Sequence, residues 1–222
     1  MEQFFLILIF IVVIVIIVFT AIQANERTKE MSEWGKRNGL EFTQKESRMD
    51  DEFPQYSCLN KGHSRYAKNI LTGVYHGSWV CAFDYHYTTG SGKNQSRHSF
   101  SALMVNTRLP LKQLFIRTEH FIDKITEFAG FDDIDFESAE FSREFYVKSP
   151  DKKWAYDVLH QKSMEYLLQA PRYTLEFQGS YVMAYRNRKF KIAEFDEAFK
   201  VIKNLLGLLP DYLMRELKGE IS

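Results

Sequence analysis

An uncharged apolar run near the start of the chain limits what the rest can be. Phe4–Ile22 reads FFLILIFIVVIVIIVFTAI and holds no charged residue, proline or glycine. At about 1.5 Å per residue a helix of this length spans roughly 28 Å, close to the hydrocarbon thickness of a bilayer. We therefore expect a transmembrane anchor over residues 1–25. It is followed by a juxtamembrane helix over 26–39 and a single soluble domain over 40–222.

A cleaved secretory signal is the alternative interpretation of this run. Such a signal needs a basic start, an apolar core of about 7–15 residues and a cleavage site of small residues. Here Glu2 is the only charged residue before the run, and the run itself is too long. Ile22-Gln23-Ala24 also fits a cleavage site poorly. These features favour a retained anchor that places Phe4–Ile22 in the lipid bilayer.

Basic residues near the anchor predict its orientation. None precedes the apolar run, and four follow it closely: Arg27, Lys29, Lys36 and Arg37. Basic residues that flank a membrane helix stay on the cytoplasmic side. We expect a single-pass protein of the inner (cytoplasmic) membrane with its C-terminal domain in the cytoplasm. The two cysteines, Cys58 and Cys81, exclude a disulfide scaffold and fit that reducing compartment.

The charge balance excludes one class of partner. The chain has 29 basic and 29 acidic residues, whereas nonspecific nucleic-acid binding requires a basic excess. We therefore expect no nucleic-acid partner. The 19 phenylalanines and 12 tyrosines provide enough apolar surface for a sizeable core in one domain.

Alternating apolar and polar residues predict a sheet in the middle of the chain. We expect four strands in an antiparallel meander: Asn69–Tyr75, Ser78–Thr88, Ser96–Asn106 and Gln113–Arg117. His76-Gly77 forms the first turn, and Leu109-Pro110 separates the last two strands. A further strand is expected at Glu144–Lys148. A second hairpin is expected from Arg172–Gln178 and Tyr181–Arg186 around Gly179-Ser180.

Helical spacing completes the prediction of an α+β fold. The expected helices are Glu119–Ala129, Lys152–Gln169 with a break near His160, Ala193–Leu208, and a last helix from Pro210 to about Lys218. Asp151 is placed to cap the second of these helices. The fold class is thus an antiparallel sheet packed with helices, preceded by one N-terminal transmembrane helix.

Three side chains in the sheet suggest a metal site. If the hairpin turns around Gly92, His86 pairs across from His98, and Asp84 shares their face. Two histidines and one carboxylate are a known ligand set for divalent transition metals. A shift of one residue in register would send His98 to the other face. The alternative is an ordinary polar sheet face, and no other cofactor is expected.

The sequence does not match two further site motifs, a phosphate-binding loop and a calcium-binding loop. Gly90–Lys93 resembles a phosphate-binding loop, but Tyr87 and Asn94 stand where that motif requires glycine and serine or threonine. The acidic run Asp132–Glu140 lacks the spacing of a calcium loop, and its phenylalanines suit core packing instead. We therefore lean against an enzyme.

Four basic residues near the second hairpin suggest contact with a membrane: Arg186, Arg188, Lys189 and Lys191. In a domain tethered to a bilayer, such residues can attract anionic headgroups, each with about 1 kcal/mol when close to the surface. The alternative is a solvated loop at a strand end.

The block Phe131–Leu168 resembles a group of uncharacterised bacterial membrane-anchored proteins of unknown function. The matching residues within it are Asp135–Glu137, Phe141, Arg143–Val147, Ser149–Asp151, Ala155-Tyr156, Val158-Leu159, Met164-Glu165 and Leu167. Gly62–Ser64, Asn69, Gly73 and the hairpin around Ala82–Lys93 resemble one subgroup of the same proteins. The family pattern sometimes has Thr-Pro in place of His160-Gln161. The resemblance implies a bacterial membrane-anchored protein and brings no catalytic residues.

The sequence thus predicts a membrane-anchored protein with a noncatalytic binding or scaffold domain at the membrane surface, with a membrane or cytosolic protein as its partner. One alternative is a metal-dependent enzyme that uses Asp84, His86 and His98. The other is a sensor of anionic lipids that uses Arg186–Lys191.

Overall fold

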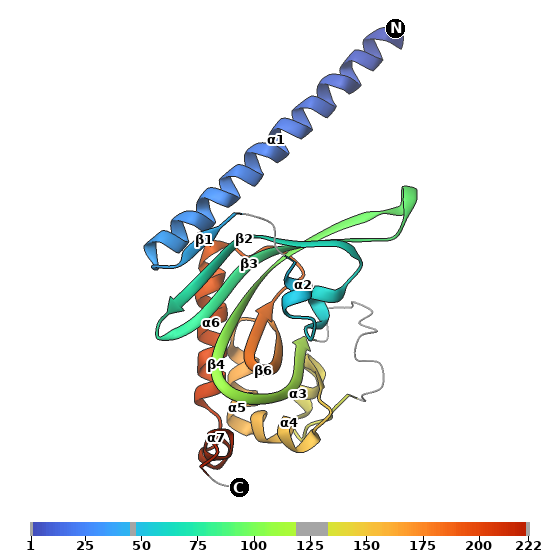
Figure 1. Ribbon diagram of the computed structural model, residues 1–222. Coiled ribbons are helices and arrows are strands. Elements are labelled where there is room, and N and C mark those ends of the chain that lie inside the picture. Colours follow the sequence, from blue (N-terminus) through green and yellow to red (C-terminus); the bar gives the residue numbers. More distant parts are fainter. Residues whose placement is uncertain (1, 45–47, 119–132, 221–222) are drawn as a thin grey trace.

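A long N-terminal helix rises away from a folded domain in the computed structural model, which describes residues 2–44, 48–118 and 133–220 (Figure 1). The helix, α1 (Glu2–Arg37), is continuous, and its N-terminal part is long and apolar enough to cross a membrane. The apolar side chains from Phe4 to Phe19 are exposed. As predicted, the helix continues past the apolar run and ends at Asn38-Gly39, where Gly39 has φ +68°.

The last turns of α1 belong to the core of the domain. Met31 is fully buried, and the ring of Trp34 lies 5.3 Å from that of Phe195. At Gly35 the helix approaches the sheet so closely that an added Cβ would lie 2.2 Å from the Leu71 side chain. The helix is therefore packed onto the domain rather than joined to it by a flexible linker.

Six strands in the described residues form one antiparallel sheet with the order β1-β2-β3-β4-β5, and β6 pairs with β4. The strands are β1 (Glu41–Thr43), β2 (His63–Tyr75), β3 (Ser78–Thr89), β4 (Ser96–Thr118), β5 (Phe145–Lys148) and β6 (Thr174–Tyr185). The predicted hairpin at His76-Gly77 is confirmed, because Tyr75 pairs with Ser78. The strand predicted near Lys148 is confirmed as well.

Two predicted interruptions of the sheet are wrong. Leu109-Pro110 does not end a strand, because β4 runs through it with shifts in register between Asn106 and Leu114. The predicted hairpin around Gly179-Ser180 is instead the middle of β6, where Gly179 pairs with Leu111. Irregular pairing allows proline and glycine within strands, because a bulge requires fewer ladder hydrogen bonds. The two strands bend together, as the curvature of β4 in Figure 1 shows.

Helices cover one face of the sheet more fully than the other. The remaining helical elements are α2 (Met49–Glu52), η1 (Ser57–Asn60), η2 (Gly92–Asn94), α3 (Ala139–Glu144), α4 (Lys152–Val158), α5 (Gln161–Gln169), α6 (Ile192–Gly207) and α7 (Asp211–Leu217). The larger core joins one sheet face to α1 and to α4 through α7, and the smaller core lies under α2 and η1. The α+β prediction is confirmed, as are the break near His160 and the cap by Asp151. The helix predicted at Glu119–Ala129 lies outside the described residues.

Candidate functional site

A buried ion pair fastens α1 to the sheet. Arg27 lies in α1 shortly after the apolar run, and Asp84 lies in the middle of β3 with no exposed surface. The guanidinium donates two hydrogen bonds to the carboxylate, with Nε–Oδ2 at 3.0 Å and Nη2–Oδ1 at 2.9 Å. This bidentate geometry is the strongest form of arginine–carboxylate contact and fixes the direction of both side chains.

Two neutral side chains complete the surroundings of the Asp84 carboxylate. Ser101 in β4 donates its hydroxyl at 2.5 Å, and Asn69 in β2 donates its amide at 3.1 Å. Burial alone would raise the pKa of Asp84, but the hydrogen bonds and charge of Arg27, with Ser101, hold that pKa below its usual range. The carboxylate is therefore held in its ionised form.

The same residues tie the ion pair to neighbouring segments. Thr28 on α1 donates to the Asn69 side chain at 3.0 Å. The Ser101 hydroxyl accepts the N–H of Phe190 at 2.9 Å, and the Ser101 N–H donates to the carbonyl of Arg188. We call these groups, centred on Arg27 and Asp84, the α1 junction. It joins α1, three strands and the segment before α6, so α1 cannot swing without breaking buried polar contacts.

The register of the β3–β4 hairpin separates the three residues proposed as metal ligands. Asp84 pairs with Ser101 and Tyr87 pairs with His98, so the predicted pairing of His86 with His98 is wrong by one residue. The hairpin is centred between Gly92 and Lys93, in the turn η2, and not on Gly92 as predicted. Every pair of residues along β3 and β4 is therefore shifted by one position from the predicted register.

The two histidines consequently have different surroundings. His98 stacks on Tyr87, whereas His86 stacks on Tyr66 at 4.8 Å between ring centroids. Burial lowers the pKa of His86 to about 4. The Asp84 carboxylate already accepts hydrogen bonds from Arg27. Within residues 2–44, 48–118 and 133–220, no group of three or more His, Cys, Asp or Glu is arranged to hold a metal ion. The structure therefore does not bring Asp84, His86 and His98 together.

The four basic residues proposed to contact lipid differ in their surroundings. Arg186 and Arg188 both pair with the buried Glu194, and Arg188 Nη2 lies 2.6 Å from Glu194 Oε1. The hydrogen bond from Arg188, with the Lys191 N–H and the charges of both arginines, outweighs burial and lowers the pKa of Glu194 to about 2. Lys191 is exposed at the start of α6. Lys189 is half-buried, and burial lowers its pKa.

Lys189 lies beside the end of the apolar run. Together with Thr20, Gln23 and Arg27 it lines a cavity of about 390 Å³ against α1. The position of Lys189 near residues that follow the apolar run was not foreseen from the sequence, because it depends on how the segment before α6 packs on the α1 junction.

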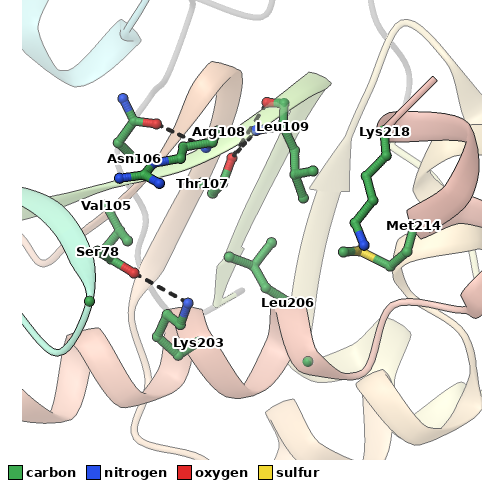
Figure 2. Close-up of a pocket in the computed structure, with 12 residues that line it drawn as sticks. Ser78, Val105, Asn106, Thr107, Arg108, Leu109, Lys203, Leu206, Met214 and Lys218 are labelled. Carbon is green, nitrogen blue, oxygen red and sulfur yellow. Dashed lines mark hydrogen bonds between the residues drawn. The ribbon is translucent and has the colours of Figure 1, made fainter. Parts of the chain in front are cut away.

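A second cavity, of about 590 Å³, lies where α6, α7, the turn between β2 and β3 and the irregular part of β4 meet (Figure 2). We call it the basic groove, because Arg108, Lys203 and Lys218 line it and no acidic residue does among those that the structure describes. Arg108 has φ +59°, a conformation that costs free energy for a residue with a side chain. Sequence analysis missed this groove, since it treated Leu109-Pro110 only as the end of a strand.

The fold defines a class of protein: an antiparallel α+β domain carried on a long N-terminal helix with an apolar segment. The chain matches no known protein-family model, and no curated protein matches it. It is similar to the crystal structure of the mycobacterial trehalose monomycolate transport factor A, TtfA, with a TM-score of 0.61 and 14% identity. The match covers 82% of this chain and 96% of that chain. At this identity the likeness concerns the fold alone.

Proposed function

We propose that this chain is a membrane-anchored accessory protein whose domain is a noncatalytic binding module at the cytoplasmic membrane surface. The α1 junction carries the proposal. Arg27 follows Ile22 by five positions, or about 7.5 Å along a helix, which is about the thickness of one headgroup layer. If the apolar run spans the bilayer, the domain is held directly against the membrane in a fixed orientation.

The rigid connection suits a protein that acts by position. An enzyme tethered only for localisation needs no buried bond between its anchor and its core, whereas a scaffold must present its binding surface at a defined height and angle. The similar structure is named as a transport factor. From this likeness we propose only the general role of an accessory protein for this chain. The basic residues after the apolar run support the cytoplasmic orientation.

Copurification tests this function. The full chain would be isolated from detergent-solubilised native membranes, together with an Asp84→Ala variant, and the same samples analysed for metal. We expect a specific protein partner with the wild-type chain and less of it with the variant, in which the buried bond between Arg27 and the sheet is lost. Stoichiometric metal, or a reaction abolished by one substitution, would point to an enzyme instead.

Contact with anionic headgroups is a second candidate function. Lys189 favours it, since this half-buried lysine lines a cavity with Gln23 and Arg27, at the level expected for headgroups. The full chain would be placed in nanodiscs of phosphatidylcholine, with or without phosphatidylglycerol, and hydrogen exchange followed at residues 186–191. Anionic lipid should slow exchange there, and salt should reverse the effect. Equal exchange in both lipids would reject this role.

A further inference from the structure

We propose that the basic groove binds a single-chain anionic amphiphile, with its acyl chain along the apolar wall and its head on the basic residues. A fatty acid carboxylate and a lysophosphatidic acid phosphate share this chemistry. The inference goes beyond the proposed accessory function and does not depend on it. The C-terminal end of α6 lines the groove, whereas the α1 junction contacts the segment before α6.

The apolar wall comes from three separate elements. Val105 and Leu109 belong to β4, Leu206 to α6 and Met214 to α7. In Figure 2, Leu109, Leu206 and Met214 point toward the middle of the groove. The volume of about 590 Å³ falls within the range of roughly 300–1,000 Å³ that small-molecule sites occupy. A flexible methylene chain fits such a wall, since its burial requires no directional contact.

The basic residues of the groove favour an anionic ligand. Arg108, Lys203 and Lys218 are exposed at its border, and none forms an ion pair with a carboxylate of the described residues. Lys203 donates to the Ser78 hydroxyl, at 3.3 Å. Three cations without an acidic neighbour in the lining provide donors for the charge-assisted hydrogen bonds that a carboxylate or phosphate accepts.

The backbone beside the groove does not suit a peptide strand. β3 pairs with β4 as far as Val105 and β5 pairs with it from Phe115, so the edge between them is open. The N–H groups of Arg108 and Leu109 already donate to neighbouring side chains, at 2.9 and 3.1 Å, and Pro110 has no N–H. Strand addition needs free main-chain donors.

The size of the groove also favours a small ligand over a protein. Twelve residues line it, whereas a standard protein interface uses about 20–30 residues on each side. An acidic amphipathic helix of a partner protein is the rival occupant, and it would use the same apolar and basic residues.

Photolabelling of the full chain tests the proposal. The chain would be reconstituted in phosphatidylcholine nanodiscs and irradiated with diazirine-bearing fatty acid, lysophosphatidic acid or fatty alcohol. Mass spectrometry would then give the ratio of label on groove peptides to label on α1, whose exposed apolar residues serve as an internal reference for nonspecific contact. We expect a high ratio for either acid or both and a low ratio for the alcohol. The acid that gives the higher labelling ratio shows whether the head group bound is a carboxylate or a phosphate.

Charge reversal provides the matched comparison. Lys203→Glu combined with Lys218→Glu should lower the ratio for the acids about tenfold or more, because charge-assisted contacts are lost. Lys200→Glu, on an exposed position of α6 outside the groove, should leave the ratio unchanged. Circular dichroism would confirm that each variant is folded; these three lysines are exposed, so folding should persist.

Several outcomes would overturn the proposal. Equal labelling by alcohol and acids would mean that the head group is not recognised. Labelling of the groove no higher than that of α1 would favour the rival helix of a partner protein. A ratio that survives the double charge reversal would exclude the basic residues as the binding determinant.

Discussion

The Arg27 guanidinium on α1 is bidentate to the Asp84 carboxylate in the centre of the sheet, and Asp84 has no exposed surface. A charge this deeply buried is stabilised only by its partners. The ion pair therefore makes the folding of the domain depend on the presence and position of α1. The turn of α1 that carries Arg27 is thus tied to the core by the ion pair, seven residues before the buried Trp34.

Removal of either partner should be costly. We expect Arg27→Ala to lower the free energy of unfolding by about 3–5 kcal/mol, because the Asp84 charge stays buried without its partner. Asp84→Ala should lower it by less, because Arg27 is part-exposed and lies near Glu30. The double variant should lose less than the sum of the two, since neither charge is stranded. Urea unfolding of the detergent-solubilised full chain measures this, with the exposed Lys29→Ala as control. Additive losses would mean that the pair does not couple.

The close approach of α1 to β2 at Gly35 gives a second test. Gly35→Ala places a methyl group 2.2 Å from the buried Leu71 side chain, so α1 or Leu71 must shift. Overpacking of this kind costs about 1–3 kcal/mol. Gly207→Ala, where an added Cβ meets nothing within 4 Å, is the matched helical control. Thermal unfolding should separate the two variants, and equal melting temperatures would contradict the packing described at Gly35.

Glu194 should contribute to stability in a pH-dependent way. Hydrogen bonding to Arg188, opposed by burial, lowers its pKa from 4.5 to about 2. A depressed folded-state pKa stabilises the protein above the unfolded-state pKa, and this stability is lost as pH falls from about 4.5 through 2. Glu194→Gln should therefore be less stable than wild type at pH 7, with the difference shrinking toward pH 2. Urea unfolding across this range tests the trend, with the exposed Glu140→Gln as control.

The sequence predicted correctly those structural features that depend on a few neighbouring residues. The apolar run, the stop at Gly39 and the cap by Asp151 are each encoded within a few residues. The continuity of β4 through Pro110 and of β6 through Gly179 was missed, because it depends on how the two strands pair with each other.

The α1 junction was harder to predict than the fold, because it is formed by residues that lie far apart in the sequence. Arg27 and Asp84 are 57 residues apart, and their pairing requires α1 to pack on the sheet. The sequence therefore indicated a charged residue after the apolar run and a polar residue in a strand, without showing that the two form a pair. The basic groove has the same origin, since its residues come from β4, α6 and α7.

The register of the β3–β4 hairpin gives the last test, because one residue decides which side chains share a face. Tyr87→Cys with His98→Cys places two thiols directly across the ladder, where the Cα atoms of opposed residues lie about 4.5–5.5 Å apart, within reach of a disulfide. His86→Cys with His98→Cys places them on opposite faces, so we expect little cross-linking under mild oxidation. Gel mobility with and without reductant measures both pairs, in a background where Cys58 and Cys81 are buried and free. Preferential cross-linking of the second pair would instead restore the register in which His86, His98 and Asp84 share a face.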